Sequence, residues 1–299
     1  MGITQEEINR SGFQLPAAPF DDWRTYDEKD PVPGYFQFDW LSSRHPDLYH
    51  RFALSTVGLM EKLHTLLDLS GLDVVDICAG SGRSSMGAAS KARRVFAVEA
   101  YSSAASFGRS QVQQGGVANI HYINADRDHI PLPTDSMDVA INAWAELNPH
   151  EAYRVLKAGG FLIQLGAIPS ALCGELTAEL VSDYPWIPRE VAPAEVYAPG
   201  YPDTFLTADP SIWDGIPVAG PIRIQQFTYV ADYQDPSEAA AMTGRLYGPK
   251  AKNYFLSRRQ SSFAWRLQII LGQVRKSAAG GTLRCAHPSN HKNKVSSPP

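Results

Sequence analysis

The central part of the chain alternates short apolar runs with polar stretches that suit helices. Short, fully apolar runs are typical of strands that are buried on both faces, as in a parallel sheet covered by helices. Strands are expected at 74–77, 95–98, 121–124, 139–142 and 161–165. Helices are expected at 84–93, 103–114 and 149–156. This alternation predicts an α/β fold in which helices cover both faces of a mostly parallel sheet.

The flanking segments carry weaker patterns. Leucines at near-helical spacing predict a helix over 46–69, and Pro46 suits its first turn. Beyond the alternating region we expect helices at 170–182 and 236–260, the second interrupted by Gly248-Pro249, and strands at 222–230 and 263–271. The segment 184–221 holds eight prolines and six aromatic residues, which predicts little regular structure there.

These patterns divide the chain into three parts. Residues 1–45 are rich in aromatic side chains and are expected to form an arm that packs on the domain. Residues 46–276 are expected to form one domain, with an insertion at about 170–221 that borders the substrate. Residues 277–299 are rich in Gly, Ser, Pro, Asn and Lys and are expected to be a disordered basic tail.

Charge and composition narrow the possible partners. The net charge of the 299 residues is −4, yet no carboxylate side chain follows Glu238, and eleven Lys and Arg residues do. Such asymmetry indicates either an anionic partner or a solvated tail.

No apolar run approaches the ~20 residues that a membrane span requires, and the polar N-terminus is unlike a signal peptide, so a cytoplasmic protein is expected. Cys78, Cys173 and Cys285 lack metal-ligand spacing, so reduced thiols and no metal site are expected.

The run from residue 74 to 83 carries the most specific chemistry. An apolar strand ends in Asp76, and Gly80 and Gly82 then form a tight turn before a helix. Glycine lets a ligand approach the backbone closely, and the helix N-terminus offers free N–H donors. Glu99 ends the next strand, where a carboxylate can accept hydrogen bonds from both hydroxyls of a ribose. These features indicate a cofactor that contains adenosine.

Two residues distinguish between the adenosine cofactors. Ser85 stands where a dinucleotide fingerprint has its third glycine. Asp76 would repel a pyrophosphate but would attract a ligand that carries an ammonium group.

Four ordered segments resemble class I S-adenosylmethionine-dependent methyltransferases of the small-molecule type, which includes the quinone-biosynthesis enzymes. The likeness covers about residues 45–170, and its segments are 76–82, 98–99, 124–140 and 153–162. It implies a Rossmann-like methyltransferase fold: a three-layer sandwich with a mostly parallel seven-stranded sheet whose last strand is antiparallel.

The resemblance also implies a role for individual residues in binding S-adenosylmethionine. The methionine portion is expected to lie against Asp76, Cys78, Ala79, Gly80, Ser81 and Gly82. Glu99 is expected to bind the ribose hydroxyls and Ala100 to border the adenine. Asp126 is expected to accept from the adenine amine with Arg127 beside the ring, and Asn142 and Ala143 to face the methionine end.

The chain also departs from the family. Cys78 and Ala79 stand where a Gly-Cys or Gly-Ala pair is more usual. Only eleven residues separate Asn142 from Arg154, so the wall beside the substrate is expected to be thin or replaced by 184–221.

The sequence therefore predicts methyl transfer to a small organic acceptor. Glu146 and His150 are candidate bases, but no catalytic residue is assigned and the oligomeric state is open. A nucleic-acid or protein methyltransferase guided by the basic end is an alternative, although the chain lacks the Asn/Asp-Pro-Pro-Tyr/Phe signature of enzymes that methylate nucleic-acid amino groups. The sequence is also compatible with a non-catalytic cofactor-binding module and, more remotely, with a nicotinamide-dependent oxidoreductase.

Overall fold

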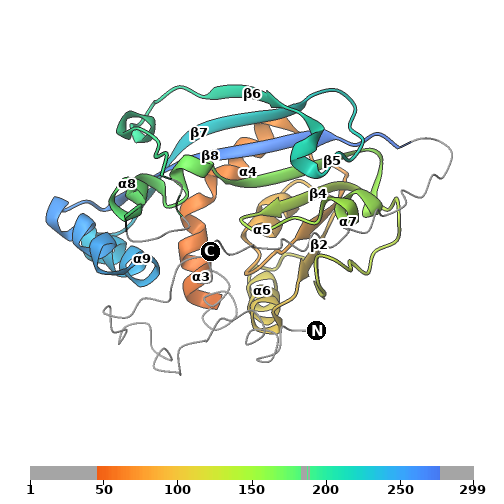
Figure 1. Ribbon diagram of the computed structural model, residues 1–299. Coiled ribbons are helices and arrows are strands. Elements are labelled where there is room, and N and C mark those ends of the chain that lie inside the picture. Colours follow the sequence, from red (N-terminus) through yellow and green to blue (C-terminus); the bar gives the residue numbers. More distant parts are fainter. Residues whose placement is uncertain (1–45, 183–186, 188, 277–299) are drawn as a thin grey trace, which may run out of the picture.

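A single mixed sheet forms the centre of the computed structural model, which describes residues 46–182, 187 and 189–276 (Figure 1). The arm expected at 1–45 and the tail expected at 277–299 lie outside these residues. The strands lie in the order β3-β2-β1-β4-β5-β8-β7-β6. Their bounds are β1 Asp73–Ile77, β2 Arg94–Glu99, β3 Ile120–Asn124, β4 Met137–Ala143, β5 Leu156–Ala167, β6 Thr204–Ala208, β7 Ile222–Asp232 and β8 Ser262–Gln273.

The first five strands are parallel to one another, as the alternating pattern predicts. β1 pairs with β2 and β4, β2 with β3, and β4 with β5, all in parallel. β8 inserts between β5 and β7 and is antiparallel to both. The mostly parallel sheet with an antiparallel last strand is thus confirmed.

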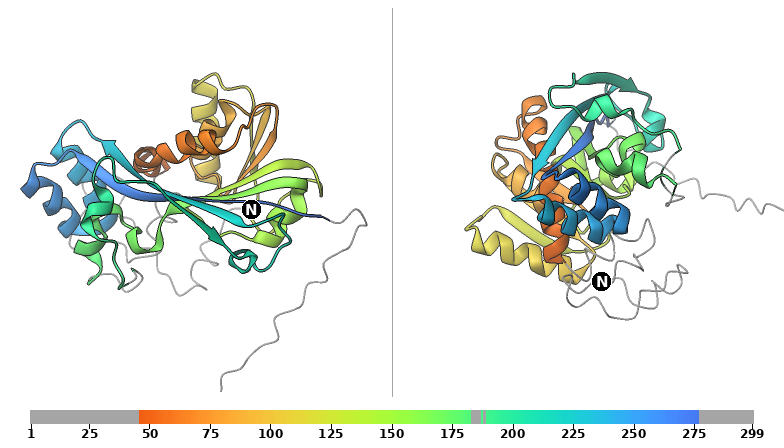
Figure 2. Two further views of the ribbon diagram at one scale, coloured as in Figure 1. Left: turned by 90° about the horizontal axis from the view of Figure 1, so that it is seen from above. Right: turned by 90° about the vertical axis from the view of Figure 1, so that its left-hand side faces the viewer.

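Helices cover the sheet on both faces (Figure 2). Their bounds are α3 Pro46–Ala53, α4 Gly58–Leu66, α5 Arg83–Ala89, α6 Ser102–Gln114, α7 Pro149–Val155, α8 Thr177–Leu180 and α9 Pro236–Arg258. Consecutive strand residues serve opposite faces: Val74 belongs to the core cluster that includes side chains of α4, α5, α6 and α9, whereas Val75 belongs to the cluster that includes α7 and Trp213. Both valines are fully buried, which explains why the central strands are mostly apolar.

An eighth strand corrects the expected number of seven. β6 lies within 184–221, where little regular structure was expected, and pairs antiparallel with β7 at the edge of the sheet. Arg266 of β8 explains why it forms, because this side chain is 2% exposed and donates hydrogen bonds to the Pro202 carbonyl and the Thr204 hydroxyl. β6 is thus stabilised by the buried Arg266 guanidinium, and the sequence alone does not predict that Pro202 and Thr204 are its hydrogen-bond partners.

Several helices are shorter than their patterns predict. The helix expected at 46–69 is broken by a 3-10 turn, Leu54–Thr56, and ends at Leu66. The helix expected at 170–182 is reduced to two 3-10 turns and α8. α9 is kinked at Gly248, which has φ 79°, as Gly248-Pro249 leads one to expect. No helix in the described ranges combines the length and apolarity needed to cross a membrane.

Candidate functional site

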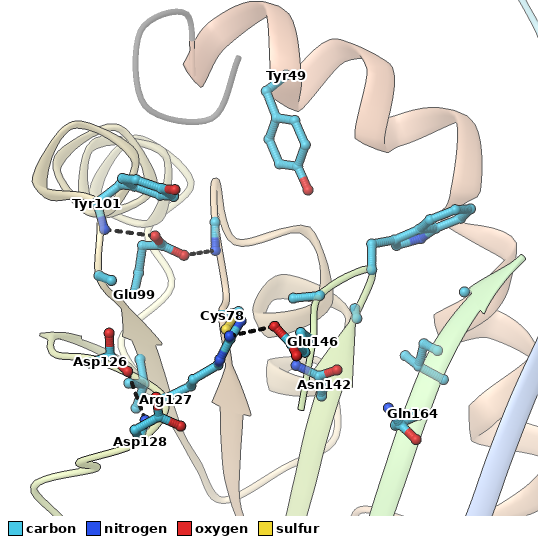
Figure 3. A pocket seen from close by; sticks show the side chains of 18 of the residues that line it. Tyr49, Cys78, Glu99, Tyr101, Asp126, Arg127, Asp128, Asn142, Glu146 and Gln164 are labelled. Atoms are coloured by element: carbon cyan, nitrogen blue, oxygen red, sulfur yellow. Dashed lines mark hydrogen bonds and ion pairs between the residues drawn. The ribbon is translucent and has the colours of Figure 1, made fainter. Parts of the chain in front are cut away.

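A cleft of about 670 Å³ opens at the carboxyl ends of the parallel strands (Figure 3). Its lining comes from the segments that follow β1, β2, β3 and β4, from β5 and β8, and from α3 above. Ligands of open α/β sheets bind at this edge, where successive loops diverge.

The turn after β1 forms the narrow end of the cleft. Gly80 and Gly82 have φ values of 56° and 90°, in the left-handed region that favours glycine. Cys78 also has a left-handed φ of 60°, although its side chain makes this conformation less favourable than it is for glycine. Cys78 lines the cleft. A side chain at Gly82 would also overlap the Tyr122 hydroxyl. The turn therefore requires glycine at position 82 for both conformation and space.

Glu99 joins this turn to the end of β2. Its carboxylate is 4% exposed and accepts hydrogen bonds from the Gly80 N–H at 2.7 Å and the Tyr101 N–H at 2.8 Å. Both bonds are drawn in Figure 3. Glu99 thereby ties the glycine turn to the end of β2 and also lines the cleft.

Asp76 lies beneath the turn and is fully buried. Its Oδ2 accepts hydrogen bonds from the Ser84 and Ser85 hydroxyls at 2.7 and 2.5 Å, while its Oδ1 is buried without a hydrogen-bond partner. Burial is the largest influence and raises the pKa of this carboxyl to about 6. Such an unpartnered carboxylate oxygen favours a nearby cationic group.

Helix α3 and the following turn form a roof over this end. Tyr49 lines the cleft from α3, and the His50 Nδ1 lies 3.0 Å from the Ser81 hydroxyl. The Arg83 guanidinium donates to the Ala53 carbonyl at 3.1 Å. Burial, and secondarily Arg83, lowers the pKa of His50, which makes a neutral ring the dominant form at physiological pH. These contacts attach the roof to the glycine turn.

The segments that follow β2, β3 and β4 carry the charge of the cleft lining. Asp126 and Asp128 follow β3, and the Arg127 guanidinium reaches across to Glu146, which follows β4, at 2.6 Å. With Glu99, the described lining holds four carboxylates and one cation. The floor beyond Asn142 is uncharged: it is formed by Gln164, Leu165, Gly166 and Ala167 of β5 with Gln268 and Ile270 of β8.

Comparisons with known proteins identify a methyltransferase domain in the chain. The family model described as "Methyltransferase domain" matches residues 74–160, which include the glycine turn and the ends of β1 to β4. Residues 74–160 are thus a methyltransferase domain. None of the curated proteins compared with it matches.

Solved structures similar to this methyltransferase are distant in sequence. The YcgJ protein of Bacillus subtilis is 17% identical, with 74% of this chain and 98% of that chain covered and a TM-score of 0.45. An S-adenosylmethionine-dependent methyltransferase of Aquifex aeolicus is 14% identical, with 84% and 100% covered and a TM-score of 0.40. Phosphoethanolamine N-methyltransferase 1 of Haemonchus contortus, in complex with S-adenosylhomocysteine, is 17% identical, with 94% and 52% covered and a TM-score of 0.41.

The structure brings most residues expected at the cofactor site of the methyltransferase into one cleft. Those that line it are Cys78, Gly80, Glu99, Ala100, Asp126, Arg127, Asn142 and Ala143. Those that do not are Asp76, Ala79, Ser81 and Gly82. All four are buried in the layer just behind the surface of the turn, so they shape the turn instead of forming its surface.

The two candidate bases differ in position. His150 lies on α7, is exposed and is not part of the cleft lining. Glu146 lines the cleft but is engaged by Arg127. Burial raises the pKa of the Cys78 thiol to about 12, so this side chain stays protonated and is no nucleophile at neutral pH.

Several lining residues were not anticipated, namely Tyr49, Tyr101, Trp144, Gln164, Leu172, Gln268 and Ile270. Gln164 was the most accessible to sequence reasoning, because a carboxamide in an otherwise apolar strand is unusual. Trp144 directly follows the predicted Asn142-Ala143 pair. Tyr49, Gln268 and Ile270 depend on how α3 and β8 are placed, which local patterns do not encode.

Proposed function

We propose that this methyltransferase modifies a small organic acceptor held in the cleft beside its cofactor. The observation that carries the proposal is a single cleft with an acidic, ribose-compatible half around Glu99 and an uncharged half on β5 and β8. When bound, S-adenosylmethionine supplies a methyl group that its positive sulfur makes electrophilic.

The residues present fit that cofactor. Glu99 lines the cleft at the end of β2, where a carboxylate can accept from ribose hydroxyls, and Asp126, exposed after β3, can accept from the adenine amine. The turn at Gly80 lies close to the unpartnered Asp76 Oδ1, whose negative charge suits the methionine ammonium group. The remaining task of the chain is to orient the acceptor and exclude water.

The cleft argues against a nucleic-acid acceptor. Nucleic-acid affinity arises largely from cations placed against phosphates, whereas the described lining has an excess of carboxylates. The quinone-biosynthesis subtype and the cytoplasmic location stay predictions of the sequence.

Calorimetry tests the proposal. S-adenosylmethionine and S-adenosylhomocysteine should bind, and NAD should not. Glu99→Ala and Asp126→Ala should each weaken cofactor affinity by about 1–3 kcal/mol because a polar contact is left unmade. Glu190→Ala, at an exposed carboxylate outside the cleft lining, is the matched control and should bind normally.

Thermal unfolding of each variant separates lost binding from lost folding, since Glu99 also supports the turn. Tight NAD binding, or unchanged affinity in both cleft variants, would contradict the proposed site. Release of S-adenosylhomocysteine with small acceptors, compared with RNA and protein acceptors, then identifies the acceptor class.

A further inference from the structure

β6 forms the edge of the sheet beyond β7. It pairs with β7 over Thr204–Ala208, and no other described strand pairs with its outer side. Figure 1 shows β6 along the upper edge of the ribbon. The backbone N–H and C=O groups on the outer side of an edge strand lack strand partners, so they can pair with a strand of another chain.

The side chains of β6 do not protect this edge. Thr204–Ala208 contains no charged residue and no proline. Phe205 is 70% exposed and Leu206 is 47% exposed, and consecutive strand residues lie on opposite faces. Edge strands are usually protected by charge, by proline or by a covering element. The composition of β6 is therefore typical of a strand that a partner covers.

An apolar groove of about 620 Å³ lies beside β6 on the face that carries Phe205. Leu66 of α4 and Ile269 and Leu271 of β8 form its apolar part. Arg223 of β7 is exposed and is the charged residue of the described lining. A partner that fits this face should offer an apolar side chain and a carboxylate.

A second copy of the chain offers both groups. If two β6 strands pair antiparallel around a two-fold axis at Phe205, the two Phe205 side chains lie directly opposite each other. Asp203 of the second copy then lies opposite Thr207, which is the register neighbour of Arg223. The small Thr207 side chain leaves room for the Arg223 guanidinium to reach that carboxylate. The Lys62 ammonium, 2.5 Å from Asp203 in the same copy, supports this cluster of charges.

The other edge of the sheet does not match β6 in this way. That edge is β3, whose exposed side chains are the polar His121 and Asn124. Pairing of β6 with β3 would leave one free edge on each end and produce an open chain of copies. Two-fold pairing of β6 with itself instead gives a closed dimer, the commonest form of homo-oligomer.

We propose that two copies of the chain form a dimer in which their β6 strands pair antiparallel and join the two sheets. The proposal goes beyond the proposed function, because it concerns assembly and not the acceptor. β5, β8, β7 and β6 are each antiparallel to the next, so the two β5 strands of the dimer run in opposite directions. The two clefts, at the carboxyl ends of these strands, therefore lie toward opposite ends of the joint sheet.

Sedimentation velocity of the full chain over a wide range of concentrations tests the dimer. Phe205→Glu should weaken dimer formation roughly hundredfold, because an aromatic pair is lost and two carboxylates then oppose each other at the axis. Leu256→Glu is the matched control: it changes a 41% exposed apolar residue of α9 outside the groove lining and should leave the dimer intact. Circular dichroism verifies that both variants are folded.

Two further changes test the register of the two strands. Phe205→Cys in a Cys285→Ser background should form an intermolecular disulfide under mild oxidation, since directly opposed residues lie within bridging distance. Thr207→Cys in the same background is the control, because Thr207 lies opposite Asp203 and far from its own counterpart. Arg223→Glu should weaken the dimer roughly tenfold, since two ion pairs are replaced by repulsion.

Each outcome decides the proposal. A concentration-dependent dimer that Phe205→Glu disrupts and Phe205→Cys crosslinks upholds it. A monomer at every concentration, or a dimer that Phe205→Glu leaves intact, overturns it. A monomer that Phe205→Glu destabilises also overturns it and shows that a segment of the same chain covers the strand. Crosslinking through Thr207→Cys alone, or no effect of Arg223→Glu, overturns the pairing centred on Phe205.

Discussion

Asp76 is the residue at which stability and function conflict most clearly. Its carboxyl is fully buried, has one oxygen without a hydrogen-bond partner, and has a pKa raised to about 6. An unfolded aspartate has a pKa of about 3.9, so folding favours the protonated form. The cofactor ammonium group would favour the charged form. The fold thus favours the protonated carboxyl, whereas the proposed cofactor would favour the charged one.

The pH dependence of stability follows from the sign of this shift. The folded state holds the Asp76 proton more tightly, so its contribution to stability is complete below about pH 4 and is lost as the pH rises through about 6. A shift of about two units corresponds to at most roughly 3 kcal/mol. Urea unfolding of the cofactor-free protein should show this decline.

Asp76→Asn should remove that decline and stabilise the cofactor-free protein at pH 8, since no carboxylate charge is then buried at this position. The same variant should weaken S-adenosylmethionine binding in calorimetry. Glu190→Gln, at an exposed position, should change neither property. Lower stability of Asp76→Asn at pH 8, together with an unchanged pH profile, would contradict this role of Asp76.

At the scale of elements, the glycine turn depends on a side chain from another strand. Tyr122 of β3 inserts its phenol between Gly82 of the turn and Gly108 of α6, and a β-carbon at either glycine would overlap it. The phenol hydroxyl is buried without a hydrogen-bond partner, and burial raises its pKa. This contact sets the distances among β3, α6 and the turn.

Gly108→Ala should destabilise the fold by about 1–3 kcal/mol through overpacking, although alanine favours a helix by up to about 1 kcal/mol over glycine. Adding Tyr122→Leu should recover part of the loss, because the smaller side chain makes room for the methyl group. A double-mutant cycle in urea unfolding measures this coupling. Strict additivity of the two changes would show that the contact does not limit packing.

At the scale of the whole molecule, the cleft and the last residues of β8 lie toward opposite ends of β5. β8 runs antiparallel to β5, and its last residue, Gln273, pairs with Phe161 near the amino end of that strand. The cleft instead uses Gln164 and Gln268, toward the carboxyl end of β5. Beyond β8, the Lys276 ammonium group donates a hydrogen bond to the Arg154 carbonyl, which lies at the end of α7.

A chain that ends at Lys276 should therefore retain cofactor affinity and small-molecule turnover. Calorimetry and release of S-adenosylhomocysteine compare it with the full chain, and the thermal unfolding midpoint controls for folding. Loss of turnover in a folded, cofactor-binding truncation would favour a nucleic-acid or protein acceptor guided by the basic end.

The sequence by itself determined the parallel half of the sheet and the family. Strands buried on both faces are mostly apolar, and the glycine turn needs φ values that favour glycine, so both leave a local signal in the sequence. Glu99 and Asp126 could be placed because Glu99 ends one strand and Asp126 lies just beyond the next.

Only the tertiary structure decided the edge strand, the roof and the uncharged floor of the cleft. β6 depends on the buried Arg266, and the roof depends on contacts of α3 with the turn. Gln164, Gly166 and Gln268 become a single surface only when β8 inserts antiparallel beside β5. That pairing joins residues about a hundred positions apart, and no local pattern specifies which side chains it brings together.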